Sequence, residues 1–589
     1  MAVETGGPAG VAGERIHPSR GGVVGIDVGG TFTDAVYIRE GRVDGYAKYP
    51  TDPGNVFGSV LGALDALGLG SREGDRIARG DGGRIVVSTT LCTNAIVSGN
   101  HRRVAAVIMP GPGLGPEDLR KALGGGFEIW PVRGYIDHRG REVEPLREDE
   151  SRGVLSEISR LGYGDIAVVG KFSIRNPSHE KAVARLSRDF VTGHVTMGHE
   201  MSGMLNFPRR VATACLNSAV ACIQESFVDE LQKALAERGF AWPSYVLKAD
   251  GGTMPIRASA RAPVETILSG PAASVIGAMS LEPGIRDAVI VDIGGTTTDV
   301  SFVVNGSPLF EPHGAVIGGR RTLVRALYSR SCALGGDNEV SAQGVIFGPR
   351  SSPAAFGGPS ATLTDALVVL GLADAGDRRR AGEAIERLAS RVGVSGEELC
   401  GRAVDSAVDH IESFVTGLID SLRSSPIYTV RELLRGAELK PRHIVGIGAP
   451  AAALVPAVAR RLGLEPRVPR FAAIGNAVGA ALATPTVGIS LHIDTREGYV
   501  AVSEEGLREP ISAFFGSATL MPDERAVREA AFRLLARRVG VDSLSSAEAE
   551  MVEYQAFNLV RGFRTVGRVI DVRVQTRPGY RRLAEEVVG

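Results

Sequence analysis

The chain contains 589 residues, 44% of them hydrophobic, which is enough apolar material for the cores of about two to four domains. Its 66 basic and 67 acidic side chains give a formal net charge of −1, so overall charge does not direct it to nucleic acid or to an anionic membrane. The five cysteines are odd in number and form no Cys-x-x-Cys pair, which argues against a disulfide framework or structural zinc and fits a reducing cytoplasm.

The N-terminal region begins with a tail and continues into a hairpin. Residues 1–21 are polar and rich in glycine and contain no apolar run, so we expect a disordered tail without a signal peptide or membrane anchor. Residues 23–37 then read as an apolar run, Asp, one apolar residue, Gly-Gly-Thr, one residue, Thr-Asp and a second apolar run. This pattern predicts two strands joined by a tight turn, whose bare backbone can approach a ligand closely.

Strands and helices alternate in the region that follows. Buried strands are predicted at residues 85–88, 104–109 and 166–170, a hairpin turn at Gly140, and a helix beginning after Asn176-Pro177. His199 and Glu200 are placed on a strand, where neighbours point to opposite faces, so we expect at most one of them in a site. These elements predict a first domain over residues 22–200.

The middle of the chain carries a second copy of the first hairpin. A long helix from Val211 to Ala236, a strand at residues 245–248 and a helix near residues 272–279 precede it. The copy spans residues 289–303. The positions that both copies share are Asp27/Asp292, Gly29/Gly294, Gly30/Gly295, Thr31/Thr296, Thr33/Thr298 and Asp34/Asp299.

The repeated hairpin is the most informative feature of the sequence. A single copy could be an ordinary Gly-Gly turn, but a turn does not require Asp, Thr and Asp at matching positions. Threonine hydroxyls and backbone amides can hydrogen-bond phosphate oxygens, and the leading aspartate can hold a hydrated Mg²⁺. We therefore interpret the two copies as a duplicated domain that closes on one nucleotide from both sides.

A third glycine loop lies in a predicted strand–turn–helix at residues 443–462. We interpret Gly446 and Gly448 as a backbone platform under adenosine; the alternatives are a dinucleotide fingerprint and a turn that needs glycine for close packing. The uncharged residues 471–491 suit a close-packed core helix followed by a strand better than a membrane span. No P-loop, Gly-x-Ser-x-Gly elbow or His-Glu-x-x-His motif is present.

The remaining elements complete the predicted organisation. A helical stretch covers residues 382–423, and a second domain is predicted over residues 201–490. A small α+β appendage is predicted over residues 491–589, with an amphipathic helix at 522–539 and a closing strand at 569–575.

The two hairpins and the late glycine loop resemble the actin-like ATPase and sugar kinase superfamily. In finer detail the chain resembles the hydantoinase A/5-oxoprolinase/acetone carboxylase β-subunit family. The segments that carry this resemblance include STTLCTNAIV from Ser88, DHRGREVEPL from Asp137, ADGGTM from Ala249 and PVETILSGPAASVIGA from Pro263. The resemblance implies an α/β fold of duplicated actin-like, ribonuclease H-like domains around a nucleotide cleft.

The same resemblance implies an ATP-dependent hydrolase that acts on the C–N bond of a cyclic amide, such as a hydantoin or a 5-oxoproline-like lactam. It would transfer a phosphoryl group to the carbonyl, with ATP and Mg²⁺ as cofactors. A hydantoinase B-type partner subunit and an oligomeric assembly are expected, whereas nucleic acid and membrane are not. The alternatives are a small-molecule kinase, a carboxylase subunit and an ATP-binding regulatory protein.

The candidate site residues follow from the hairpins and from the resemblance. Asp27 and Asp292 are assigned to catalysis and to Mg²⁺, and Asn94 and Asp250 resemble catalytic segments of the family. The residues expected to bind the nucleotide are Gly29, Gly30, Thr31, Thr33, Gly294, Gly295, Thr296, Thr298, Gly446 and Gly448. The sequence departs from the family pattern at Arg209 and in the loop at residues 352–357, which lacks the usual Asp and Cys, so the substrate stays open.

Overall fold

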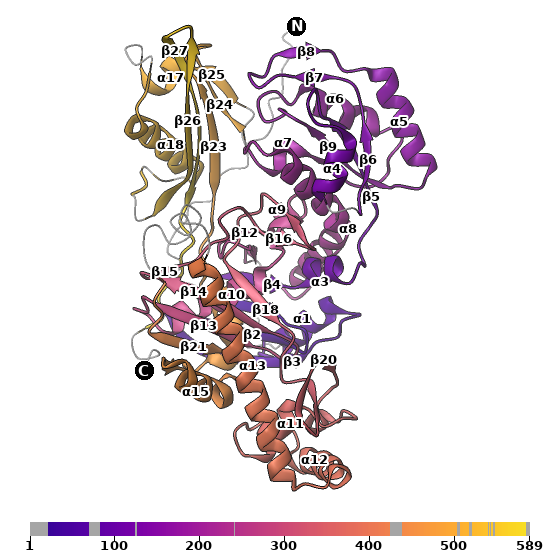
Figure 1. Cartoon of the computed structure of the whole chain (residues 1–589), viewed down its shortest axis with the longest axis vertical. Coiled ribbons are helices and arrows are strands. Elements are labelled where there is room, and N and C mark those ends of the chain that lie inside the picture. Colours follow the sequence, from indigo (N-terminus) through magenta and orange to yellow (C-terminus); the bar gives the residue numbers. More distant parts are fainter. Residues whose placement is uncertain are drawn as a thin grey trace.

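The computed structural model describes residues 22–69, 83–123, 126–240, 242–424, 439–503, 507–516, 521–539, 541, 543–545 and 548–584. The tail predicted at residues 1–21 lies outside these ranges. Figure 1 shows an elongated molecule whose two central sheets carry three further parts: an upper right α/β part, an upper left antiparallel sheet and a lower helical part.

The first central sheet contains the first hairpin. Its strands are β1 (Val23–Val28), β2 (Phe32–Arg39), β3 (Arg42–Pro50), β4 (Arg84–Thr89), β11 (Ser244–Leu247) and β12 (Thr253–Pro255). Their order is β12-β11-β4-β1-β2-β3, in which β1, β2 and β3 are antiparallel neighbours and β4 and β11 run parallel to β1. The strand β1 is buried along its whole length, as its continuous apolar run predicts.

The second central sheet repeats this arrangement. It contains β13 (Ala288–Ile293), β14 (Thr298–Val304), β15 (Ser307–Pro308), β21 (His443–Ile447) and β22 (Glu465–Arg467), with β18 (Ser329–Cys332) added beside β14. The order β15-β14-β13-β21-β22 matches β3-β2-β1-β4-β11 strand by strand, with the same antiparallel and parallel neighbours. The predicted duplicated α/β fold is therefore confirmed.

Two small-residue helices join the repeats at the centre of the molecule. The helices α10 (Ser269–Leu281) and α16 (Gly475–Leu482) pack against each other, and α16 also packs on β1. A Cβ on Gly277 would lie 2.1 Å from the carbonyl oxygen of Gly475, and one on Gly479 would lie 2.1 Å from that of Ala273. Glycine is thus required for these two backbones to touch.

An α/β insertion separates β4 from β11. It contains a parallel sheet in the order β10 (Val195–Met197), β9 (Asp165–Gly170), β5 (Val104–Met109) and β6 (Glu128–Pro131). Its helices are α3 (Leu91–Val97), α4 (Pro116–Leu123), α5 (Glu148–Arg160), α6 (Ser178–Ser187), the one-turn α7 (Gly198–Met201) and the long α8 (Phe207–Glu237). The hairpin predicted at Gly140 joins β7 (Tyr135–Ile136) to β8 (Glu142–Glu144).

The helix α8 returns the chain to the first sheet. Among the described residues it is the one helix long and apolar enough to cross a bilayer, but 78% of its most apolar window is buried, partly against β9 and β5. Because β11 and β12 follow α8 and pair beside β4, the first sheet extends past the boundary that we placed at residue 200.

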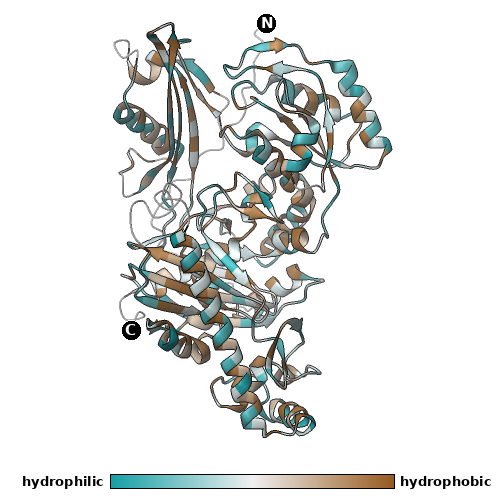
Figure 2. Ribbon diagram, in the orientation of Figure 1, coloured by the Kyte–Doolittle hydropathy of each residue, from teal (hydrophilic) through white to brown (hydrophobic). Residues whose placement is uncertain are grey.

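A second insertion, between β14 and β21, forms the lower part of Figure 1. Its hairpin of β19 (Asn338–Ser341) and β20 (Gly344–Arg350) packs against α11 (Leu363–Val369) and α13 (Gly396–Ser424), and α12 (Arg378–Val392) packs against these two helices. The single helical stretch predicted at residues 382–423 is two helices, because Gly393 ends α12 in the left-handed conformation with φ +77°. Figure 2 shows the alternation of hydrophobic and hydrophilic residues along these helices.

The C-terminal part is an antiparallel sheet with helices on one face. Its order is β25 (Leu507–Pro510), β24 (Tyr499–Val502), β23 (Gly488–Asp494), β27 (Arg564–Thr576) and β26 (Ala549–Arg561). The helices α17 (Ile511–Phe515) and α18 (Glu524–Val539) accompany this sheet, and α18 contributes Val527, Ala531 and Leu535 to a shared core. Figure 1 shows this part beside the α/β insertion. It begins at residue 488, close to the predicted boundary.

Candidate active site at the paired hairpins

The two Gly-Gly hairpins have the same internal geometry. In the first, Asp27 lies opposite Asp34, and the Gly29 amide donates to the Phe32 carbonyl at 3.0 Å. In the second, Asp292 lies opposite Asp299, and the Gly294 amide donates to the Thr297 carbonyl at 2.9 Å. Residues directly opposite in an antiparallel pair share a face, so each hairpin presents two carboxylates side by side.

The tips of the two hairpins touch each other. A Cβ on Gly30 would lie 3.3 Å from Thr296 Cγ2, and one on Gly295 would lie only 2.2 Å from Thr31 Oγ1. Thr31 Oγ1 also donates a hydrogen bond of 2.7 Å to Asp337 Oδ2, from the second repeat. The repeated glycines therefore permit a direct contact between segments that are far apart in sequence.

The two central helices hold the carboxylate of Asp292. Its Oδ2 accepts a hydrogen bond of 2.5 Å from Ser274 Oγ of α10 and one of 2.9 Å from Asn476 Nδ2 of α16. Burial raises the pKa of Asp292, and these two hydrogen bonds oppose that rise. The carboxylate is thus fixed in position by groups from both helices.

The other three aspartates of the hairpins interact electrostatically with Asp292, and little positive charge lies near the four carboxylates. Burial, with the charges of Asp34 and Asp292 adding to it, raises the pKa of Asp27 to about 7, while Ser88 and Asn476 oppose the rise. Burial and the charge of Asp292 likewise raise the pKa of Asp299 to about 7. Burial also raises the pKa of Asp34, against the effect of its partner Lys48.

Lys48 is the cation that the structure places nearest to this cluster. Its Nζ donates to Asp34 at 2.7 Å and to the Ala473 carbonyl at 3.0 Å. Lys48 therefore links the first hairpin to the segment before α16. One lysine leaves most of the carboxylate charge uncompensated, which favours binding of a further cation.

The carboxylates fit a hydrated Mg²⁺ rather than a closed metal cage. Asp27 Oδ1 is buried and has no hydrogen-bond partner within the described part of the chain, and the same holds for Asn476 Oδ1. Within that same part, no three His, Cys, Asp or Glu side chains gather closely enough to form a complete site. Mg²⁺ typically keeps several waters and uses one or two carboxylates together with substrate phosphates, so Asp27 and Asp292 fit this mode.

Two of the predicted phosphate ligands point elsewhere. The hydroxyls of Thr33 and Thr51 lie 2.9 Å apart, and the hydroxyl of Thr298 donates to the Leu334 carbonyl at 2.8 Å. Both Thr33 and Thr298 are fully buried. Each precedes an aspartate that faces the cluster, and adjacent strand residues point to opposite faces. The structure therefore supplies Thr31 and Thr296 at the tips, but not Thr33 and Thr298, as candidate phosphate ligands.

The two glycines of the third loop have different surroundings. Gly448 has a φ of +91°, and a Cβ there would lie 2.1 Å from the Ile293 carbonyl oxygen and 3.0 Å from Asp292 Oδ1. Gly448 is thus in direct contact with the second hairpin. A Cβ on Gly446 would instead lie 2.8 Å from Val455 in α15 (Ala451–Leu462), so Gly446 serves helix packing.

Asn94 and Asp250 lie in different surroundings. Asn94 is exposed on α3 and donates to Thr90 Oγ1 at 3.2 Å, which in turn donates to the Val28 carbonyl at 3.2 Å, so it borders the first hairpin. Asp250 is buried; its carboxylate accepts from the Gly252 amide at 2.9 Å and lies 3.4 Å from Lys248 Nζ. No hydrogen bond within the described residues joins Asp250 to the four-aspartate cluster.

Electrostatics give Asp250 a structural character. Burial raises the pKa of the Asp250 carboxyl, whereas the charges of Lys248 and Arg325 and the hydrogen bond from the Gly252 amide lower it. The lowering effects are larger together, so the pKa of Asp250 lies below its usual value. Lys248 also contacts Glu265 at 3.3 Å. Asp250 therefore orders the loop after β11, two strands away from β1.

Sequence reasoning missed several residues of the cluster. Ser88 and Ser274 lie within segments that carry the family resemblance but were assigned no role. Lys48 and Asp337 were not singled out, and Asn476 was assigned only to a core helix. A lone amide side chain in the uncharged residues 471–491 could have identified Asn476. His199 lies on the one-turn helix α7 rather than on a strand, and its Nδ1 is 2.5 Å from Glu180, away from the hairpins.

Profiles of one protein family match most of the chain. The profile of the hydantoinase/oxoprolinase N-terminal region matches residues 23–191, and the hydantoinase/oxoprolinase profile matches residues 210–488. The caprolactamase subunit alpha of Pseudomonas jessenii is 25% identical over 481 residues, which are 73% of this chain and 65% of that protein. The chain spans less than two thirds of the length of the curated relatives that it matches first. It covers 62% of an uncharacterized protein of Methanocaldococcus jannaschii and 65% of the caprolactamase subunit.

Two solved structures share the fold along most of the chain. The nucleotide-free structure of acetone carboxylase, from a study of ATP-dependent acetone carboxylation, has a TM-score of 0.66 at 19% identity and covers 94% of this chain and 87% of its own. The ATP-dependent caprolactamase from Pseudomonas jessenii has a TM-score of 0.59 at 19% identity, with 95% and 88% covered. At these identities the likeness concerns the fold.

Proposed function

The chain belongs to the hydantoinase/oxoprolinase family, and on that premise we propose that it is an ATP-dependent subunit that activates a cyclic amide. The observation that carries this proposal is the contact between the two hairpins, which brings Asp27 and Asp34 of the first within electrostatic range of Asp292 of the second. Such a cluster, short of cations and bordered by glycine amides and threonine hydroxyls, has the chemistry to receive a metal-bound triphosphate.

The proposed reaction answers a chemical difficulty. An amide carbonyl is a poor electrophile, because nitrogen donates electron density to it. Transfer of the γ-phosphoryl group of ATP to the carbonyl oxygen breaks the bond to ADP and gives an activated imidate phosphate. Water then adds to its carbon, and the tetrahedral adduct expels the ring nitrogen as an amine, which opens the C–N bond and leaves an acyl phosphate. A second water hydrolyses the acyl phosphate to a carboxylate and inorganic phosphate. The protein mainly positions the reactants and stabilises charge in such transfers.

The residues divide this work in the proposal. Asp27 and Asp292 would hold a hydrated Mg²⁺, which would neutralise charge on the phosphates. Thr31 and Thr296 donate from the tips together with the adjacent glycine amides. Gly448 presents bare backbone beside the second hairpin. We assign Asn94, which is exposed at the border of the first hairpin, to contact with the substrate.

A second polypeptide is part of this proposal. The relative from Pseudomonas jessenii is named as a subunit, and the chain spans only part of its length. We assign hydrolysis of the activated intermediate to a hydantoinase B-type partner. The five cysteines are unpaired and four are buried, which supports placing the protein in a reducing compartment such as the cytoplasm.

The test measures ADP release by the purified chain with Mg²⁺ and ATP, screened against hydantoin, 5-oxoproline and caprolactam, with and without a B-type partner. Substrate-stimulated ADP release with a ring-opened product supports the proposal. Because acetone carboxylase shares the fold, acetone with bicarbonate belongs in the same screen, and a carboxylated product would favour a carboxylase subunit instead. A stable phosphorylated product would favour a kinase, and nucleotide binding without turnover a regulatory protein.

A further inference from the structure

The hairpin of β26 and β27 forms an open edge of the C-terminal sheet. Among the strands that the structure describes, β26 pairs only with β27, although it is 13 residues long. One side of β26 therefore offers a row of backbone N–H and C=O groups to another strand. Figure 1 shows this hairpin running the length of the C-terminal part, on the side where α18 lies.

The outer half of this hairpin exposes large apolar side chains. Phe557 is 55% exposed, Val560 63% and Phe563, in the turn, fully exposed. The inner half differs, because Ala549, Met551 and Tyr554 belong to the core shared with α18. Aromatic and aliphatic side chains gathered on one projecting hairpin are typical of a surface that another protein covers.

The exposed edge also lacks the usual protection. Natural edge strands are kept apart by charged residues, prolines or short length. Residues 555–560 read Gln-Ala-Phe-Asn-Leu-Val and contain neither a charge nor a proline. An uncharged, largely apolar stretch on an open sheet edge is a template for pairing with another strand.

The charges on either side of this edge complement each other in reverse order. Glu553 lies four residues before Phe557 and Arg561 four residues after it, on the same face of the strand. An antiparallel copy of β26, related by a two-fold axis through Phe557, places Glu553 opposite Arg561 of that copy, twice by symmetry. A strand that carries opposite charges at equal distances from its centre is complementary to itself.

We propose that β26 pairs antiparallel with β26 of a second copy of this chain, which joins the two C-terminal sheets into one continuous sheet. Phe557 of each copy then lies on the axis. In this register Phe563 of the second copy lies level with Met551, two residues from Glu553, which lines a cavity together with Leu205 of the α7–α8 connection.

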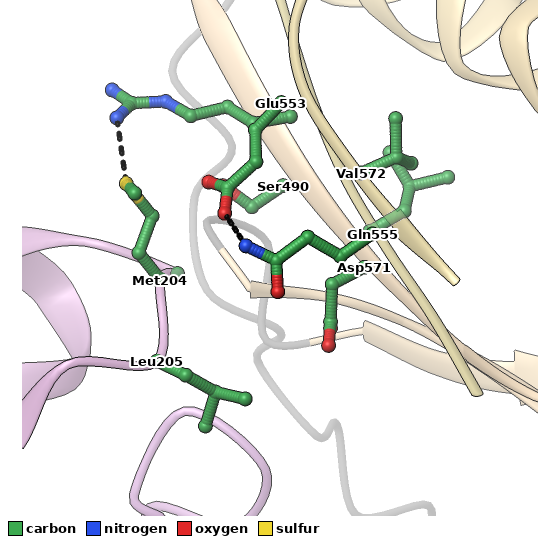
Figure 3. A pocket seen from close by; sticks show the side chains of 10 residues that line it. Met204, Leu205, Ser490, Glu553, Gln555, Asp571 and Val572 are labelled. Carbon is green, nitrogen blue, oxygen red and sulfur yellow. Dashed lines mark hydrogen bonds between the residues drawn. The ribbon is translucent and has the colours of Figure 1, made fainter. Parts of the chain in front are cut away.

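The connection between α7 and α8 exposes an apolar side chain. Leu205 is 40% exposed. It lines, with Met204, Glu553 and Gln555, a cavity of about 20 Å³ between the α7–α8 connection and the C-terminal sheet (Figure 3). Figure 3 shows the hydrogen bonds that join Gln555 to Glu553 and Arg573 to Met204 there. The cavity has room for about one water molecule and not for a ligand. Only the exposed side chains at its edge, such as Leu205, are therefore available for contact with a second copy.

The test is the association state of the full chain, measured by sedimentation velocity and light scattering across a concentration series. We expect a dimer that Phe557→Lys dissociates by at least about tenfold in Kd, because it places two like charges on the axis. Val143→Lys, at an apolar residue 60% exposed on β8, is the matched control and should leave the dimer intact.

Exchanging the two charges of β26 separates loss of pairing from misfolding, because a misfolded single variant would not be restored by the second substitution. Glu553→Arg and Arg561→Glu should each weaken the dimer by about three- to tenfold, and the double variant should restore it, because each cross-strand charge pair contributes up to ~1 kcal/mol. A chain that stays monomeric throughout, a dimer that ignores both single changes, or single losses that add in the double variant would each overturn the proposal. A monomer that binds only a different polypeptide through Phe563 would overturn it as well.

Discussion

Thr31 and Asp337 join the two repeats through one hydrogen bond, 2.7 Å from the threonine hydroxyl to the carboxylate, although 306 positions separate them in sequence. A threonine hydroxyl has a single proton to donate. The same hydroxyl is our candidate phosphate ligand, so it cannot donate to Asp337 and to a phosphate oxygen at once. Asp337 is therefore a competitor that a nucleotide has to displace.

Asp337→Ala should consequently strengthen nucleotide binding. A neutral hydrogen bond contributes about 0.5–1.5 kcal/mol net, and one to a charged group somewhat more, so the dissociation constant of a MgATP analogue should fall by about three- to tenfold. Isothermal titration calorimetry measures this change. Asp374→Ala, at an exposed aspartate of the same insertion, should leave the affinity unchanged. An unchanged or weaker affinity in Asp337→Ala would show that the bond assists binding instead.

The stability of the metal-free chain should fall as the pH rises from acidic values to about 7. The pKa of Asp27 is raised by burial and by neighbouring carboxylates from 3.8 to about 7. Between these values the folded state binds a proton that the unfolded state has lost, so the free energy of unfolding decreases with pH and levels off above about 7. For Asp27 alone the loss is at most ~4 kcal/mol.

Thermal unfolding from pH 5 to 8 with and without Mg²⁺ measures this effect. We expect Mg²⁺ to stabilise the chain more at pH 8 than at pH 5, because protonated carboxyls bind it poorly. Asp27→Asn should raise the melting temperature at pH 8 and reduce the response to Mg²⁺. A Mg²⁺ response that is equal at both pH values would argue against metal binding by this cluster.

Asp292→Asn should abolish most turnover without unfolding the chain. The free Oδ1 of Asn476 allows that amide to rotate and accept from the new side chain, so local hydrogen bonding can be kept. The loss of negative charge should lower ADP release by at least about 100-fold, a cost typical of groups that act in the transition state. Asp250→Asn provides the contrast: it should reduce stability through Lys248 but retain most turnover. Equal losses in both variants would place Asp250 in the mechanism.

Local pattern was sufficient to predict the hairpins and most helices and strands near them. A Gly-Gly turn between two apolar runs depends on neighbours in sequence, so Asp27 and Asp292 could be placed at strand ends without a structure. The partners of these aspartates could not be. Ser274 and Asn476 reach Asp292 because two glycine-rich helices pack backbone to backbone, and no short-range pattern encodes that approach.

The same distinction explains the differences in the site and the domain boundaries. Thr33 and Thr298 match the repeat, but strand alternation turns them away from the faces of Asp34 and Asp299. The strand β11 was recognised as a strand, yet its pairing with β4 depends on the whole α/β insertion between them. Pairing over such a separation is a tertiary property, and an alternation of helices and strands does not reveal it.

A single methyl group should separate the role of Gly448 from ordinary glycine flexibility. Gly448 and Gly463 both have positive φ values, +91° and +66°, so alanine costs about 1 kcal/mol of backbone strain at either. At Gly463 the new methyl group meets open space, whereas at Gly448 it would lie 2.1 Å from the Ile293 carbonyl oxygen. We expect Gly448→Ala to destabilise the chain by about 2 kcal/mol more than Gly463→Ala in urea unfolding, and to weaken nucleotide binding because it displaces the second hairpin. Similar losses in the two variants would mean that the third loop and the hairpin are not coupled.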